Sequence, residues 1–129
     1  MTRGPSDLPA AGVAYEWLPS LGGRRRPRPD SVNTAWRSAS FRGYADYLAS
    51  PEFDAGLAQL LAAACTGRAA MMCSEVLWWR CHRALIADVL RFQGFQVLHI
   101  LDATHCTPHP YSAAARIVDG ALSYRATAA

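Results

Sequence analysis

The sequence contains no lysine. Its 13 residues of the lysine and arginine type are all arginine. Abundant arginine and alanine together are typical of a GC-rich genome, so the number of arginines by itself says little about function. Their placement says more, because a guanidinium binds phosphate or carboxylate through two parallel hydrogen bonds. We therefore take only clusters of arginine as indications of a binding site.

Long apolar stretches are also missing. The stretches of low polarity near residues 55–65 and 69–79 fall short of the roughly 20 residues that a membrane-spanning helix needs. The first 15 residues contain Pro5, Asp7 and Pro9 in place of the apolar centre of a secretory signal. We therefore expect a cytoplasmic protein that has no membrane partner.

Cysteine is too sparse for a disulfide scaffold, and the absence of a Cys-x-x-Cys pair argues against a zinc ribbon or a thioredoxin-like redox motif. We expect reduced thiols and no cofactor. His105, Cys106 and His109 bring three potential metal ligands within five residues. Pro108 and Pro110 make a shared geometry difficult, so an exposed connection is the favoured alternative and we predict no metal.

What is present predicts one folded domain. The chain has 129 residues, of which 51% are hydrophobic and 18% charged. This composition argues against disorder, and the length is sufficient to bury a core without disulfides. We expect an irregular lead over residues 1–12 and a single domain over residues 13–125.

The hydrophobic patterns predict alternating strands and helices. Ser50 and Pro51 are typical of a helix start, and Gly67 and Gly94 of helix ends. The expected strands are residues 13–18, 69–73 and 95–101, and the expected helices are residues 41–48, the segment from Ser50 to Gly67, and residues 80–93.

The order of these elements predicts an α/β fold. A strand, a helix and a strand between residues 69 and 101 form a βαβ unit, which implies a parallel pair with a right-handed crossover. Asp119 and Gly120 predict a tight turn in a hairpin over residues 115–124. We therefore expect a small, mostly parallel sheet that is flanked by helices and followed by a short C-terminal hairpin.

Residues 73–83 join the predicted buried strand to the predicted helix, which is where open α/β sheets bind ligands. The start of a helix attracts anions through its amides and its dipole. Arg80 and Arg83 add positive charge there, His82 adds a titratable group, and Trp79 offers a stacking surface. We predict that this segment binds a phosphate-bearing ligand, either a nucleotide or a nucleic acid.

The same segment also allows an enzyme that acts on a nucleotide or nucleic acid. Cys73 is a candidate nucleophile because the helix dipole and the arginines favour a thiolate, although a buried structural thiol is the alternative. The spacing from Cys73 to Arg80 is one residue longer than in cysteine-dependent phosphatase loops. Glu75 is either an acid–base partner of His82 or an ion-pair partner of a nearby arginine.

A second basic cluster lies in the loop before the first predicted helix. Basic residues that alternate with aromatic residues suit a nucleotide or a nucleic-acid backbone, whereas the alternative is an idle solvated loop. We expect the arginines of residues 24–28 to close over the bound anion. The candidate ligand-binding residues here are Arg24, Arg25, Arg26, Asn33, Trp36 and Arg42.

Five segments together resemble a known family. They are Leu18-Pro-Ser-Leu-Gly-Gly-Arg24, Asn33-Thr-Ala-Trp36, Phe41-Arg-Gly-Tyr-Ala-Asp-Tyr47, Met72-Cys-Ser-Glu75 and Trp78-Trp-Arg-Cys-His-Arg83. In this order and spacing they are similar to the bacterial family called domain of unknown function 488, from about residue 8 to residue 124. No agreed activity accompanies the family. The resemblance implies a compact cytosolic α/β domain whose polar signature residues gather at one sheet edge.

The resemblance also implies a unit that residues 1–12 do not match. Members of the family usually begin with a further βαβ unit, which contains a Gly-His-Ser/Thr turn and an Asp-x-Arg motif. A sheet without this unit would carry an exposed edge, through which copies of the chain could associate. A shortened, inactive family member is therefore a further expectation beside ligand binding and catalysis.

Overall fold

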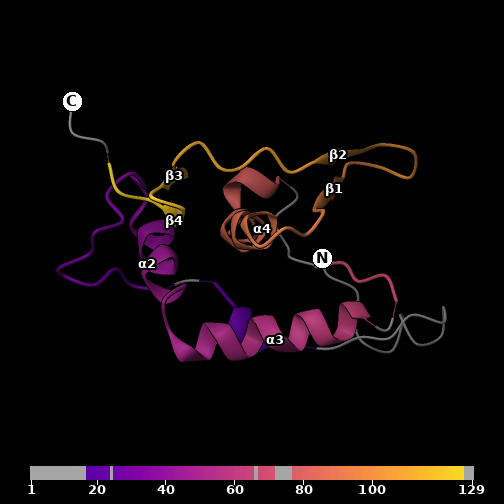
Figure 1. Ribbon diagram of the computed structural model, residues 1–129, viewed down its shortest axis with the longest axis horizontal. Coiled ribbons are helices and arrows are strands. Elements are labelled where there is room, and N and C mark those ends of the chain that lie inside the picture. The colour runs from indigo at the N-terminus through magenta and orange to yellow at the C-terminus, as the bar shows by residue number, and fades with distance from the viewer. Residues whose placement is uncertain (1–16, 24, 66, 72–76, 127–129) are drawn as a thin grey trace.

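The computed structural model describes residues 17–23, 25–65, 67–71 and 77–126. Within these residues, three α-helices lie beside two small hairpins (Figure 1). The α-helices are α2 (Ala39–Tyr47), α3 (Pro51–Cys65) and α4 (Arg83–Phe92), and the short 3-10 helices are η1 (Pro19–Leu21) and η2 (Trp78–Arg80). The strands are β1 (Leu98–Ile100), β2 (Cys106–Pro108), β3 (Arg116–Val118) and β4 (Ala121–Ser123).

Figure 1 shows how these elements are arranged. Helix α3 runs along one side of the molecule, and α4 lies above it and is seen almost end-on. The β1–β2 hairpin and the β3–β4 hairpin lie on the far side of α4 from α3, at opposite ends of the molecule, with α2 next to β3 and β4. Helix α4 is therefore the central element, which the other parts of the chain surround.

The predicted parallel sheet is not formed, so the expectation of an α/β fold is wrong. Among the described residues, β1 pairs only with β2 and β3 only with β4, and both pairs are antiparallel. Residues 69–71 have no regular secondary structure, and residues 72 and 73 lie outside the described residues. The expected strand at residues 13–18 also lies mostly outside them.

The prediction fails because β1 pairs with a segment that is close to it in the sequence. Residues 95–101 contain a strand, as predicted, but β1 pairs with the segment that follows it after a loop of residues 101–105. The carbonyl of His105 accepts hydrogen bonds from the amides of Leu101 and Asp102, at 2.9 and 3.3 Å, which closes this loop. A short loop costs less chain entropy than a crossover through a helix, so local pairing replaces the βαβ unit.

Local signals for element ends and turns are confirmed. Ser50 Oγ accepts a hydrogen bond from the amide of Phe53 at 3.1 Å, so α3 begins where the Ser50-Pro51 pair predicts. Gly94, with a φ of 95°, follows the end of α4. Asp119 and Gly120 have φ values of 52° and 74°, as a tight hairpin turn requires, and they join β3 to β4.

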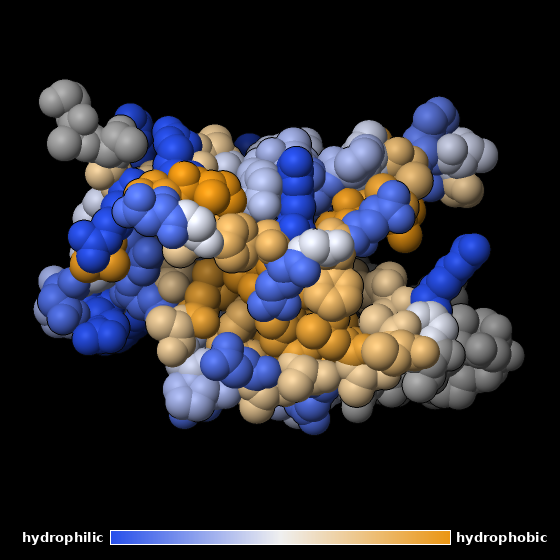
Figure 2. Space-filling view, in the orientation of Figure 1, coloured by the Kyte–Doolittle hydropathy of each residue, from blue (hydrophilic) through white to orange (hydrophobic). Residues whose placement is uncertain are grey.

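One face of the molecule is mainly apolar. In Figure 2 the apolar residues gather over α3 and the space between α3 and α4, with hydrophilic residues towards the edges. Helix α3 is rich in leucine and alanine, which explains this band. No helix formed by the described residues is long and apolar enough to cross a membrane.

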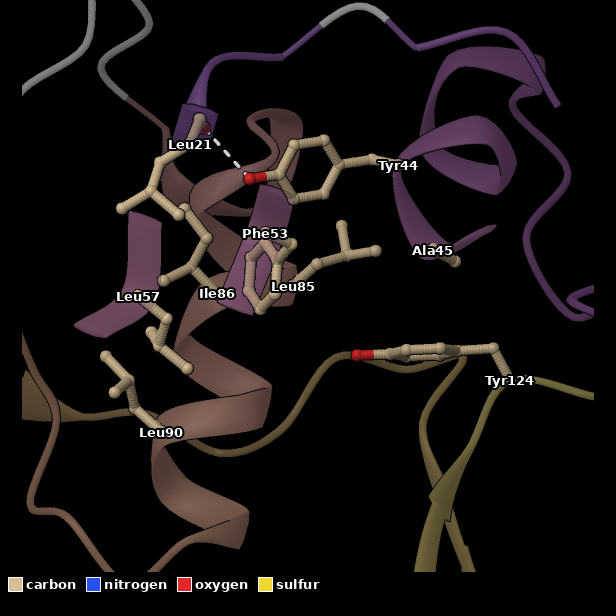
Figure 3. Close-up of a cluster of buried hydrophobic side chains, with 9 residues drawn as sticks. All are labelled: Leu21, Tyr44, Ala45, Phe53, Leu57, Leu85, Ile86, Leu90 and Tyr124. Carbon is tan, nitrogen blue, oxygen red and sulfur yellow. Dashed lines mark hydrogen bonds between the residues drawn. The ribbon is translucent and has the colours of Figure 1, made fainter. Parts of the chain in front are cut away.

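The hydrophobic core lies where α2, α3 and η1 meet α4 (Figure 3). Leu85 and Ile86 of α4 are buried and point towards Phe53 of α3. Tyr44 of α2 is also fully buried, and its hydroxyl donates a hydrogen bond of 2.8 Å to the carbonyl of Leu21. The core consists of Leu21, Tyr44, Ala45, Phe53, Leu57, Leu85, Ile86, Leu90 and Tyr124.

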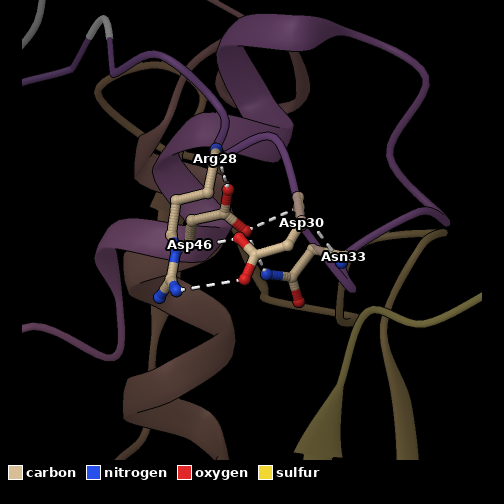
Figure 4. A network of polar contacts seen from close by, with 5 residues as sticks. Arg28, Asp30, Asn33 and Asp46 are labelled. Atoms are coloured by element: carbon tan, nitrogen blue, oxygen red, sulfur yellow. Dashed lines mark hydrogen bonds and ion pairs between the residues drawn. The ribbon is translucent and has the colours of Figure 1, made fainter.

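Asp46 of α2 fixes the loop that precedes this helix (Figure 4). Its carboxylate accepts hydrogen bonds from the Arg28 amide at 2.8 Å, Ser31 Oγ at 2.7 Å and Asn33 Nδ2 at 2.6 Å. Desolvation on its own would raise the pKa of Asp46, but these hydrogen bonds lower it overall. The side chain of Arg28 instead forms an exposed ion pair with Asp30 at 3.2 Å.

Gly43 sets how closely this loop approaches α2. It is buried, and a Cβ at this position would overlap the carbonyl oxygen of Arg25. We expect Gly43→Ala to lower the free energy of unfolding by about 1–3 kcal/mol, although alanine favours helices, because backbone atoms must move. Urea denaturation measures this change. Ser40→Ala, at an exposed position of α2, is the control, and an equal effect in both variants would contradict the prediction.

The charge of Asp46 should contribute more to stability than that of Asp30. We expect Asp46→Asn to lower the free energy of unfolding by about 1–2 kcal/mol, because charge-assisted hydrogen bonds are lost. Asp30→Asn should cost less than about 1 kcal/mol, because it removes only an exposed ion pair. Because the pKa of Asp46 is lowered by folding, its contribution is present above about pH 3.9 and disappears as the pH falls further. Urea denaturation at pH 7 and pH 3 tests both expectations, and equal losses in the two variants at pH 7 would contradict the first.

Candidate functional site

His82 and Arg83 lie at the start of α4, where η1 and α2 approach it. His82 is the residue before the first helical turn, and Arg83 is the first residue of the helix. The ring of His82 packs against Tyr44, with 5.0 Å between centroids. A Cβ on Gly23 would come within 2.6 Å of His82 Nδ1, so the absence of a side chain at Gly23 makes room for the imidazole.

Arg25 brings a second guanidinium to this imidazole. Its guanidinium carbon lies 3.8 Å from the centre of the Tyr47 ring, which is a cation–π contact. Its Nε atom is buried and makes no hydrogen bond to the described residues. Desolvation lowers the pKa of His82, a hydrogen bond with the Leu21 backbone opposes this, and the charges of Arg83 and Arg25 lower it further. The pKa of His82 is therefore lowered, and the charges of two arginines act on its ring.

The backbone amides at the start of α4 are already hydrogen-bonded. The amide of Arg83 donates to Cys81 Sγ at 3.5 Å, and the amide of Ala84 donates to the Cys81 carbonyl at 3.0 Å. The amide of Leu85 donates to the carbonyl of His82 at 3.0 Å. Any anion at this place is therefore attracted by side chains and by the helix dipole, and the expected cradle of free amides is not present.

The structure describes some, but not all, of the other candidate residues in the segment 73–83. Arg80 and Trp79 belong to η2, a separate 3-10 helix before α4, so the predicted helix start at residue 80 is wrong by about a turn. Both are exposed, and Trp79 retains 53% of its accessible surface. Cys73 and Glu75, the candidate nucleophile and acid, lie outside the described residues.

The second basic cluster does not form one site. Asn33 is bound to Asp46, and the Trp36 ring packs against Phe41 and Tyr124. Arg42 donates a hydrogen bond of 3.3 Å to the carbonyl of Trp36. These three residues therefore have structural partners within the fold.

Among the described arginines of that cluster, Arg25 is the one whose charge acts on His82. Arg25 contributes to the charge around this imidazole, and Arg26 is exposed. Arg24 lies outside the described residues.

A cleft of about 430 Å³ lies beside the loop that Asp46 holds. Arg28, Asn33 and Asp46 line its polar side, and Val89 and Tyr124 line its apolar side. The polar groups of Asn33 and Asp46 bind one another there, so the cleft presents few unsatisfied groups to a ligand.

Sequence reasoning missed a buried polar network around Asp88 of α4. Asp88 is fully buried, and its Oδ1 atom lies 2.6 Å from Nε2 of the buried His109. The same Oδ1 accepts from the amide of Ser112 at 2.8 Å, and Oδ2 accepts from the hydroxyl of Tyr124 at 2.7 Å. Nδ1 of His109 then lies 2.7 Å from Nε2 of His99 in β1.

Trp78 covers the outer histidine of this network. The rings of Trp78 and His99 are nearly parallel, with 5° between their planes and 4.3 Å between their centroids. Desolvation lowers the pKa of His99 to about 4, with further contributions from the charges of His109 and Arg83. Because Arg83 influences both His82 and His99, the two imidazoles lie within the electrostatic reach of the same guanidinium.

One signal in the sequence points to this network. Asp88 stands three residues after Leu85, on the buried face of an otherwise apolar helix. A carboxylate in such a position needs partners from elsewhere in the chain, and histidines are the candidates. Nothing local identifies which histidines, because residues 88, 99 and 109 meet only through the fold.

The expected ligand types at residues 105–109 are separated in the structure. His109 is buried against Asp88, whereas the exposed His105 pairs with Asp102 at 2.8 Å. Cys106 is exposed in β2. Among the residues that the structure describes, no group of three or more His, Cys, Asp or Glu side chains is arranged to hold a metal ion.

Comparison with known proteins gives one match. No curated protein and no solved structure matches the chain. The model of one protein family, described as Domain of unknown function DUF488, matches residues 2–90, which is more than half of the chain. This range includes α2, α3 and most of α4, together with Arg25, His82 and Arg83. The chain therefore belongs to the DUF488 family.

Proposed function

We propose that the protein binds a phosphate-bearing ligand, either a nucleotide or a nucleic acid, beside the start of α4. The observation that supports this best is that the charges of Arg25 and Arg83 both act on the half-buried His82. The positive potential to which Arg25 and Arg83 contribute at this half-buried place attracts an anion. The positive end of the α4 dipole acts in the same direction.

The geometry of Arg25 favours phosphate over a simple halide. Its guanidinium lies over the Tyr47 ring, and no described carboxylate forms an ion pair with it. Its buried Nε makes no hydrogen bond to the described residues. A planar guanidinium that is held in place by an aromatic ring is well suited to bind two oxygens of one phosphate group.

Trp79 and Arg80 suggest what is attached to the phosphate. Both are exposed in η2, which packs against α4 close to His82 and Arg83. An exposed indole next to cationic side chains is a typical stacking surface for a nucleobase. We therefore favour a nucleotide, free or within a single-stranded nucleic acid, over inorganic phosphate as the natural ligand.

Removal of Arg25 should weaken binding of inorganic phosphate. We expect Arg25→Gln to raise the dissociation constant about tenfold, because a charge-assisted hydrogen bond is lost. Isothermal titration calorimetry with sodium phosphate at constant ionic strength measures this. Arg125→Gln removes the same charge from the end of the C-terminal hairpin, and it should change the constant less than twofold.

Two outcomes would reject the phosphate site. One is an unmodified chain that gives no phosphate-dependent heat, and the other is an equal effect of the two substitutions. Circular dichroism of each variant shows whether its fold is retained. Arg25→Lys keeps the charge without the planar fork, and it should bind phosphate with intermediate affinity.

Trp79 should affect nucleotide binding but not phosphate binding. We expect Trp79→Ala to weaken binding of ADP at least fivefold, since base–aromatic stacking contributes about 1–3 kcal/mol. The affinity for inorganic phosphate should stay within twofold of the unmodified chain. Trp17→Ala removes a second exposed indole, which retains 75% of its surface, and should leave both affinities unchanged. Equal ADP affinities in the two variants would contradict a stacking role.

A further inference from the structure

We propose that His99 is the acid–base group of a phosphodiester hydrolase, and that His109 and Asp88 form a relay that stabilises the proton it takes up. This inference rests on the proposed phosphate site, which would hold the substrate beside His99. The geometry that supports it is a continuous hydrogen-bonded chain from a fully buried carboxylate to a half-buried imidazole.

Asp88 forms the inner end of this series of hydrogen bonds. Its two oxygens accept hydrogen bonds from His109, Ser112 and Tyr124, at 2.6, 2.8 and 2.7 Å. The three partners replace the water that this buried carboxylate has lost. With His109 neutral, its Nε2 atom donates a proton to Asp88 and its Nδ1 atom is left as an acceptor, which is the arrangement that we propose.

This tautomer of His109 determines which atom of His99 donates a hydrogen bond and which carries the lone pair. Nε2 of His99, 2.7 Å from His109 Nδ1, must donate its proton to that atom. The lone pair of His99 then lies on Nδ1, which makes no hydrogen bond to the described residues. Trp78 stacks on the ring and fixes its plane, so the direction of this lone pair is set by the fold.

When His99 takes up a proton, the positive charge can move along the hydrogen bonds to His109. When Nδ1 of His99 gains a proton, the proton on its Nε2 moves to Nδ1 of His109. The positive charge then lies next to the Asp88 carboxylate, where it is compensated. A second proton would place two positive rings in contact, which is unfavourable. Desolvation, with further contributions from the charges of His109 and Arg83, lowers the pKa of His99 to about 4.

A purely structural role explains Asp88 and His109 but leaves His99 unexplained. The bond from His109 to Asp88, together with that from Arg91 to the His109 carbonyl at 2.8 Å, already attaches the β1–β2 hairpin to α4. An apolar ring at position 99 would pack under Trp78 equally well. The polar atoms of His99 extend the network beyond His109, and the charge of Arg83 acts on this ring.

The proposed step is the hydrolysis of a phosphodiester, without any oxidant or reductant. A water oxygen forms a bond to phosphorus, and the proton that this water loses goes to Nδ1 of His99. The bond between phosphorus and the leaving oxygen breaks, and its electron pair stays on that oxygen. The proton on the histidine pair then returns to solvent. Arg25 and Arg83 would neutralise the charge on the phosphoryl oxygens during this step.

The test uses bis(p-nitrophenyl) phosphate and the full chain. We expect slow release of p-nitrophenolate, with a rate that falls as the pH drops and the histidine pair gains its proton. His99→Gln should lower this rate at least 100-fold, as removal of a general base typically does. The matched control is His105→Gln, which changes an exposed histidine of the same hairpin and should leave the rate within twofold.

Phosphate affinity separates this inference from the proposed function. If His99→Gln loses hydrolysis but binds inorganic phosphate within twofold of the unmodified chain, the acid–base role is supported. A chain that binds phosphate without hydrolysing the diester overturns this inference and leaves the proposed function intact. Unchanged hydrolysis in His99→Gln overturns it as well. Absence of phosphate binding overturns both proposals.

A second measurement does not depend on any variant. Nitrogen-15 NMR of the histidine side chains at pH 8 should show His99 protonated at Nε2 and not at Nδ1, with His109 protonated at Nε2. Protonation of the pair should then place the new proton on Nδ1 of His99 and move the proton of His99 Nε2 to Nδ1 of His109, in one shared step. A proton found on His99 Nδ1 at pH 8 would contradict the relay, even if His99→Gln failed to fold.

Discussion

The buried carboxylate of Asp88 joins segments that the chain places far apart. It lies on α4, yet its partners come from the loop after β2 and from the residue after β4. Burying a charge is costly unless its hydrogen bonds are satisfied, so all of these partners must be in place together. The two hairpins bury little apolar surface, as the exposure of β1–β3 indicates. Asp88 therefore specifies where they sit on the helices, while the apolar core stabilises the helices themselves.

The parts of the fold that could be predicted from the sequence are those set by neighbouring residues. Ser50 and Pro51 begin α3, Gly94 follows α4, and Asp119-Gly120 makes a turn because each acts through its own backbone. The sheet could not be predicted in this way. An apolar run such as residues 95–101 indicates a strand but not its partner, and the partner is chosen by loop entropy and by packing.

The residues of the candidate site likewise divide into those that local sequence signals reveal and those that only the fold brings together. His82 and Arg83 could be found because they are adjacent in sequence and their position before an apolar helix is a local signal. The contribution of Arg25 was only partly predictable, since it depends on the close approach that Gly43 permits. Asn33 and Arg42 were assigned to the site from residue type alone, and the structure gives them other partners. The three residues of the relay lie in three separate segments, so the local pattern marks Asp88 and does not reveal its histidine partners.

The attachment of the β1–β2 hairpin has a consequence for how this protein opens. Leu98, Ile100 and Leu101 are exposed, so few apolar contacts hold the hairpin in place, and an isolated two-stranded hairpin has little stability of its own. Directional hydrogen bonds are either made or broken, whereas apolar packing weakens gradually. The hairpin should thus detach as one cooperative unit while the helical core stays folded, and its amides should exchange with solvent at a common rate well above that of α4.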